Sequence, residues 1–244
     1  MIKQQIISFC ILAISVILAY ILSIGPASGF KAWVAKKMGD DTGERMGLLT
    51  LDPLEHIDLL GVCLFLPLLV IAFRMSIFVG FTAILILWSL GVSWHRVVVI
   101  NASYIQGRFR LLKLFLAYFS EVAIYLMQAM FGLVFLAFVE YSAHRFFGVL
   151  MSQQLVVVGA LIQFVLVFIQ LNIMLAVVSF INNGVLLGIV IFHERSEHDY
   201  LDYLYYGALI LPLVILVFFG AHLQKIFYFL LIQLYTLFVR LFGN

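Results

Sequence analysis

Long stretches without charged residues dominate this sequence, and the first of them covers residues 6–24. A helix needs about twenty consecutive apolar residues to cross the hydrocarbon core of a bilayer. Hydrophobic residues make up 65% of the chain and charged residues 11%, against about 45–50% and about 25% in soluble domains. Too few polar side chains remain to cover a soluble surface. The composition excludes a soluble enzyme, a nucleic-acid-binding protein and a disordered chain, and it predicts an integral membrane protein surrounded by the lipid bilayer.

The apolar stretches predict an all-α polytopic protein with about five to seven membrane segments, in a single membrane domain that covers residues 1–244. The first segment is expected to end at Gly25-Pro26, and another at Asn182-Asn183-Gly184, because such residues break helices. One apolar stretch, 57–92, is too long for one span and barely long enough for two. In chain order the predicted segments are residues 6–24, 57–92, 114–139, 155–181, 208–221 and 226–242.

Two stretches between these segments predict elements at the membrane interface. Residues 97–100 form a β-branched run that Asn-Ala-Ser follows, which is typical of a short β-strand. Residues 140–154 are amphipathic, which favours a position at the membrane surface.

The charges predict how the chain is oriented. Basic residues cluster at 31–45 and at 96–113, whereas residues 193–206 are acidic. The positive-inside rule places both basic clusters in the cytoplasm and the acidic segment on the opposite side.

Three stretches contain motifs in a recognisable order. Residues 29–61 read GFKAWVAKKMGDDTGERMGLLTLDPLEHIDLLG, residues 94–101 read WHRVVVIN, and residues 172–188 read NIMLAVVSFINNGVLLG. The first stretch resembles the A-W-V-A, G-D-P-T and G-R-L-T-L-N-P-L-x-H-I-D-P-I-G motifs of the site-2 protease family of intramembrane zinc metalloproteases. The second is similar to that family's G-W-x-K-P-V-P-V-N, and the third to its N-L-x-L-A-x-x-N-L-L-P-I-P-P-L-D-G helix. The resemblance covers most of the chain and implies the family's helical core.

The chain departs from the family at every catalytic position. In the family, two histidines of HExxH and the aspartate of L-D-G hold the zinc, and the glutamate is the general base. The alignment places Ala27 and Lys31 at the histidines, Ser28 at the glutamate and Leu187 at the aspartate. A catalytic zinc needs three protein ligands and an open position for water. Ala27 and Leu187 cannot bind a metal, and the charge of Lys31 repels one. The departures predict that the protein is not an enzyme and uses no metal or other cofactor.

The remaining histidines offer no replacement for the zinc site. The segment HERSEH (193–198) resembles HExxH, but its histidines are five residues apart, so they do not share a helix face. His56 and Asp58 are expected to form structural hydrogen bonds. The isolated histidines, His95 among them, are expected at the membrane interface.

Glu121 lies inside an apolar stretch, where an ionisable residue is costly and is a functional candidate. Three interpretations remain open. Glu121 is protonated or reaches the interface in a structural role, it contacts a partner subunit or a translocated ion, or it pairs with Lys31. In the third case the ion pair occupies the volume that zinc and its ligands would fill.

Three further polar residues lie within one predicted span. Gln163 and Gln170 are seven residues apart, so they share one helix face, and Asn172 lies close by. Polar side chains in spans usually join helices through hydrogen bonds. Internal packing and a partner interface are both compatible with this pattern.

The leading functional hypothesis is a catalytically inactive site-2-protease-like scaffold, assembly or regulatory subunit that binds a membrane partner, expected in the bacterial inner membrane. One alternative is a small transporter or channel-like protein that uses Glu121. Another is a protease with non-standard metal ligands.

Overall fold

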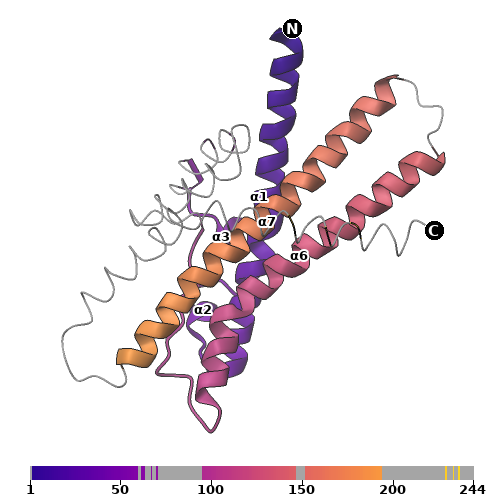
Figure 1. Ribbon diagram of the computed structural model, residues 1–244. Coiled ribbons are helices and arrows are strands. Elements are labelled where there is room, and N and C mark those ends of the chain that lie inside the picture. The colour runs from indigo at the N-terminus through magenta and orange to yellow at the C-terminus, as the bar shows by residue number, and fades with distance from the viewer. Residues whose placement is uncertain are drawn as a thin grey trace.

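Three long helices form the framework of the protein. The computed structural model describes residues 2–59, 62–63, 67, 70, 95–146, 152–193, 229, 233 and 236. The long helices pack against one another in all three pairs, and two short helices follow the first of them (Figure 1). In chain order the elements are α1 (Ile2–Met38), α2 (Thr42–Arg45), α3 (Pro53–His56), α6 (Arg110–Phe146) and α7 (Ser152–His193).

Each long helix contains a stretch that is long and apolar enough to cross a membrane, namely Gln5–Met38, Arg110–Val139 and Val157–Ile191. The protein is therefore an all-α membrane protein over the described residues. The predicted segments at 57–92, 208–221 and 226–242 lie largely outside those residues. The total of five to seven segments stays a prediction.

The helix break expected at Gly25-Pro26 is wrong, because α1 continues without interruption to Met38. Proline has no N–H, so Pro26 leaves the carbonyl of Leu22 without its helical donor. The Nε2 group of Gln128 on α6 donates to that carbonyl at 3.3 Å. A side chain from a neighbouring helix thus replaces the lost hydrogen bond, which is how transmembrane helices tolerate proline.

The break expected at Asn182-Asn183-Gly184 is also wrong, because α7 runs through it to His193. Asn183 is fully buried there and its side-chain oxygen accepts an interhelical hydrogen bond from Lys31. At the other end of the bundle, α6 continues to Phe146 and so includes half of the stretch expected at the membrane surface. Both helices exceed the roughly twenty residues that a bilayer requires.

The short β-strand expected at residues 97–100 is absent from the described part of the chain. The only pairing there is an isolated antiparallel bridge between Ile57 and His95. The stretch is held at its ends instead, where the Arg96 N–H donates to the His56 carbonyl at 2.9 Å and the Asn101 N–H donates to Asp40 Oδ2 at 2.7 Å. A backbone carbonyl at one end and a carboxylate at the other therefore accept these hydrogen bonds.

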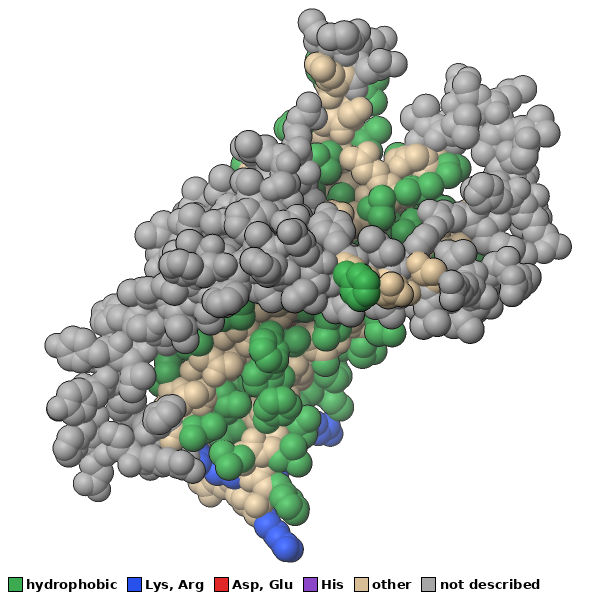
Figure 2. Space-filling view, in the orientation of Figure 1, with side chains coloured by type: hydrophobic (Ala, Val, Ile, Leu, Met, Phe, Trp, Pro, Cys, Tyr) green, Lys and Arg blue, Asp and Glu red, His purple; other side chains and the backbone are tan. Residues whose placement is uncertain are grey.

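The charge pattern predicts that the acidic segment 193–206 lies across the membrane from the basic clusters, and this stays a prediction because the segment lies outside the described residues apart from His193. One apolar cluster contains Met38 at the end of α1, Leu114 at the start of α6 and Val190 near the end of α7. These three helix ends therefore lie at the same end of the bundle, where Figure 2 also shows lysine and arginine side chains. Because α7 is not broken at residue 182, it delivers His193 to the basic end.

The main core lies where α1, α6 and α7 meet. Its fully buried members include Tyr20 of α1, Tyr125 of α6 and Leu171 of α7. A polar contact crosses the same core, since Asn172 Nδ2 donates to Ser23 Oγ at 2.9 Å. The three helices are therefore fixed in register by both shape and hydrogen bonding.

The backbone between α2 and α3 lies directly against α1 at two glycines. A Cβ atom on Gly25 would lie 2.8 Å from the carbonyl oxygen of Leu51, and one on Gly29 would overlap the carbonyl oxygen of Thr50. Only residues without a side chain permit this approach. The glycines thus bring residues 50–51 against the part of α1 that the sequence analysis aligned with HExxH.

This packing predicts that Gly29→Ala destabilises the protein by about 1–3 kcal/mol, because the methyl group must displace a backbone carbonyl. The matched control is Gly159→Ala on α7, where an added Cβ meets nothing within 4 Å. Thermal unfolding in detergent measures both effects. Equal melting temperatures for the two variants would contradict the close approach.

Candidate functional site

Four buried side chains from all three long helices form a closed cycle of hydrogen bonds, which we call the polar ring: Lys31, Glu121, Ser179 and Asn183. Lys31 Nζ lies 3.0 Å from Glu121 Oε2 and donates to Asn183 Oδ1 at 2.9 Å. Asn183 Nδ2 donates to Ser179 Oγ at 2.9 Å, and Ser179 Oγ donates to Glu121 Oε2 at 3.1 Å. Each member thus contacts two others.

The second carboxylate oxygen of Glu121 contacts two further side chains. Tyr125, one turn along α6, donates its hydroxyl to Oε1 at 3.2 Å. His95 Nε2 lies 3.3 Å from the same atom. An ionised carboxylate has about four lone-pair positions. Two donors on each oxygen therefore satisfy Glu121 completely.

Burial makes this complete pairing necessary. The side chains of Lys31 and Glu121 are each 4% exposed. An unpaired charge inside a membrane protein is strongly unfavourable, whereas a pair with additional hydrogen bonds is tolerated. Lys31 and Glu121 balance each other, and the ring is a neutral polar unit within an apolar bundle.

The structure places the four residues that the resemblance aligns with the zinc site in different surroundings. Ala27 and Lys31 lie one turn apart on α1 and both are buried. Ser28 is buried as well, and its hydroxyl has no hydrogen-bond partner among the described residues. Leu187 does not join them, because it packs against the apolar cluster around Ala35.

Asn183, one turn before Leu187, is the α7 residue that contacts Lys31. Leu187, which the resemblance aligns with the family's aspartate, therefore lies one turn away from the α7 side chain that reaches Lys31. This side chain is a neutral hydrogen-bonding amide, and its oxygen is already occupied by Lys31.

Of the three interpretations of Glu121, the structure agrees with the one in which Glu121 pairs with Lys31. Three other contacts are not predicted by the sequence. Asn183 belongs to a predicted helix break, His95 is predicted at the interface although it is 6% exposed, and no motif singles out Ser179. Two spacings in the sequence indicate shared helix faces. Glu121 and Gln128 are seven residues apart, and Ser179 and Asn183 are four residues apart.

The three motif-bearing stretches converge around the ring. Asp40 from the first stretch accepts hydrogen bonds from the Thr42 backbone N–H and from the Asn101 backbone N–H of the second stretch. Lys31 of the first stretch contacts Asn183 of the third. Segments far apart in sequence thus form one unit.

His56 makes a structural hydrogen bond. It is fully buried, and its Nε2 lies 2.8 Å from the Thr50 carbonyl, which can only accept. Nε2 therefore carries the proton in the neutral ring. Burial lowers the pKa of His56 below its ordinary value of 6.5, against the opposing effect of the Thr50 hydrogen bond. Asp58 is half-buried and interacts electrostatically with Tyr20.

The polar residues predicted on one span separate into two groups. Asn172 is buried and joins α7 to Ser23 of α1, which fits internal packing. Gln163 and Gln170 are half-buried and lie outside the polar ring. The HERSEH segment lies outside the described residues apart from His193.

Comparison of the chain with models of protein families, with curated proteins and with solved structures finds no match.

The ring predicts a strong energetic coupling between Lys31 and Glu121. Lys31→Met or Glu121→Gln alone is expected to cost about 3–5 kcal/mol of unfolding free energy, because each change breaks a buried pair. The double variant is expected to lose less than the sum of the single losses.

The matched control is the pair between Lys36 and Glu44, whose side chains are 43% and 45% exposed. Each alanine substitution there is expected to cost less than about 1 kcal/mol. Chemical unfolding in detergent measures all variants. Purely additive losses at Lys31 and Glu121 would disprove the coupling.

The lowered pKa of His56 predicts that acid destabilises the protein. The unfolded chain binds more protons than the folded chain between the two pKa values of this group, so stability rises with pH there. The contribution of His56 is complete above about pH 6.5 and is lost as the pH falls through its folded pKa.

Melting temperatures of the wild type and of His56→Gln, measured between about pH 8 and about pH 5, test this effect. The wild type is expected to lose more stability on acidification, so that the two curves converge at low pH. Parallel curves would show that His56 does not contribute.

Proposed function

We propose that this protein is a catalytically inactive, site-2-protease-like membrane protein that acts as a scaffold, assembly or regulatory subunit for a membrane partner. The observation that carries the proposal is the position of the Lys31 ammonium group in the polar ring. Lys31 stands where the motif alignment expects a zinc-binding histidine, and it forms an ion pair with Glu121 at 3.0 Å. On that alignment, a fixed positive charge takes the place of one metal ligand.

The chemistry of the surrounding residues supports this reading. Ala27 has no ligand atom, Ser28 offers one neutral hydroxyl, and the amide oxygen of Asn183 already accepts from Lys31. A catalytic zinc requires three protein ligands and an open position. In the described ranges, moreover, no cluster of three or more histidine, cysteine, aspartate or glutamate residues is placed to hold a metal ion.

The helix arrangement that the polar ring holds together supports a scaffolding role. Lys31, Glu121 and Asn183 come from α1, α6 and α7, so the ring joins α6 to the two helices that contain motifs resembling the family, α1 and α7. A fold that keeps its helix arrangement without catalytic groups retains surfaces for binding membrane helices. The saturation of Glu121 by four contacts argues against transport, because a translocated ion or proton would have to displace one of them.

Affinity purification of the tagged full-length protein from its native membrane in mild detergent tests this function, with mass spectrometry of the associated proteins and measurement of zinc. We expect one membrane protein in stoichiometric amount, recovered uncleaved, and no stoichiometric zinc. Recovery of the protein alone would count against a scaffold. Stoichiometric zinc together with a cleaved partner would instead indicate a protease with non-standard ligands.

A further inference from the structure

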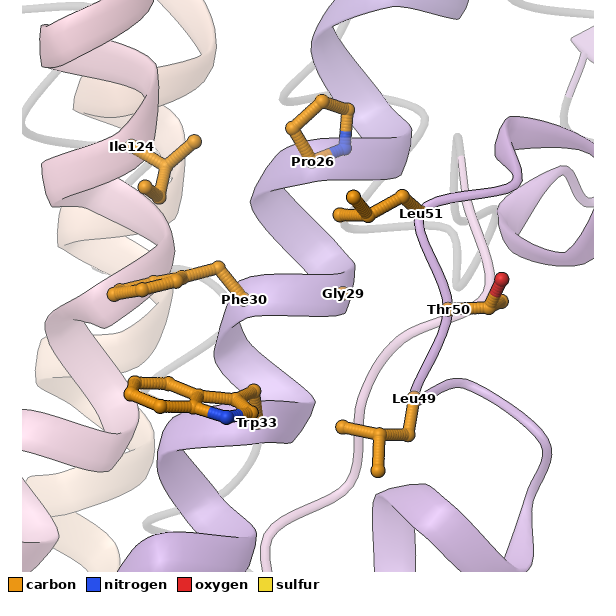
Figure 3. Close-up of a pocket in the computed structure, with 8 residues that line it drawn as sticks. All are labelled: Pro26, Gly29, Phe30, Trp33, Leu49, Thr50, Leu51 and Ile124. Carbon is orange, nitrogen blue, oxygen red and sulfur yellow. The ribbon is translucent and has the colours of Figure 1, made fainter.

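An apolar groove of about 460 Å³ runs along α1 beside the polar ring, on the side of residues 49–51. Figure 3 shows its walls, which come from α1, from the segment between α2 and α3, and from α6. The large side chains that form them are Phe30 and Trp33 with Leu49, Leu51 and Ile124. None of the described residues that line the groove is charged. We therefore expect an apolar occupant.

The groove follows one face of α1 toward the end of the helix. Pro26, Phe30 and Trp33 lie at helical spacing on this face, and Lys37 continues it one turn after Trp33. The distance along the axis from Pro26 to Lys37 is about 16 Å at the rise of an α-helix. The groove thus leads from the membrane-spanning part of α1 toward a cation in its last turn.

Lys37 differs from the neighbouring cations in its partners. Lys36 pairs with Glu44 at 2.6 Å, and Arg45 pairs with Asp41 at 2.8 Å. In the described part of the chain Lys37 has no carboxylate partner, and its Nζ lies 5.8 Å from the centroid of the Trp33 ring. Its side chain is exposed. A cation available for an external anion therefore lies next to the tryptophan at the rim of the groove.

We propose that the groove binds one acyl chain of an anionic phospholipid whose phosphate contacts the Lys37 ammonium group. The two parts of such a lipid match the two parts of the site, since the chain fits an apolar groove and the phosphate complements an unpaired cation. Tryptophan and lysine are typical of the level at which headgroups lie, and basic positions beside membrane helices bind anionic headgroups. This inference does not depend on the proposed function.

The site favours a lipid chain over a partner helix. A helix with its side chains is about 10–12 Å across, whereas this groove is narrowed by the segment that touches α1 at Gly29. A chain of methylene groups is thinner and needs no hydrogen-bonding partners. Lipid is also always present around α1, because the helix crosses the membrane.

Native mass spectrometry of the delipidated full-length protein tests the proposal, with phosphatidylglycerol and phosphatidylcholine of identical acyl chains as the probes. We expect tighter binding of phosphatidylglycerol, and a roughly tenfold loss of this binding in Lys37→Ala, which removes one charged contact. Lys37→Arg is expected to retain it. Ile124→Trp narrows the groove and is expected to weaken binding of both lipids.

The matched control is Lys36→Ala, which removes the same charge from the same helical turn but from a cation that is already paired. Equal losses in Lys36→Ala and Lys37→Ala would show general surface electrostatics and overturn the proposal. Equal binding of the two lipids would overturn the headgroup contact. A co-purified membrane protein that crosslinks to position 124 and excludes lipid would assign the groove to a helix instead.

Discussion

A carboxylate inside a membrane bundle has to obtain from the protein every contact that water would otherwise provide. Glu121 meets this requirement through Lys31 and Ser179 on one oxygen and Tyr125 and His95 on the other. Because these donors come from α1, from α7, from α6 itself and from the stretch after residue 94, the pairing fixes the relative positions of all of them. Apolar packing alone would hold the helices together but would distinguish less sharply between alternative registers.

The same requirement explains why the helices continue where the sequence suggests that they end. Backbone and side-chain polar groups at such points are acceptable in a membrane when a neighbouring helix supplies partners. Gln128 donates a hydrogen bond to the Leu22 carbonyl, which Pro26 leaves without a donor. Lys31 and Ser179 form hydrogen bonds with the side-chain amide of Asn183. Polar residues that usually mark turns therefore join helices in this protein. The continuous α7 in turn carries the chain to the end of the bundle where α1 ends and α6 begins.

Apolar stretches were sufficient to predict the three described spanning helices, since bilayer thickness sets a minimum length. Their ends were not predictable, because proline and asparagine signal breaks only when no tertiary partner is present. The pairing of Lys31 with Glu121 was one of three interpretations, because two opposite charges in apolar surroundings favour contact. The contributions of His95 and Asn183 depend on how segments 26 and 152 residues apart meet, and no local pattern contains that information.

The central claim is that Glu121 is an ionised carboxylate whose counter-charge is Lys31. Infrared difference spectroscopy in lipid membranes tests it directly, because a protonated carboxylic acid gives a carbonyl-stretch band. The band belongs to Glu121 if it changes when Glu121 is labelled or substituted. Wild-type protein is expected to lack this band for Glu121. Lys31→Met is expected to create the band, because the lone carboxylate takes up a proton. Adding Glu121→Gln to that variant is expected to remove it. A protonated Glu121 band in the wild type, unchanged by Lys31→Met, would contradict the ion pair on which the account rests.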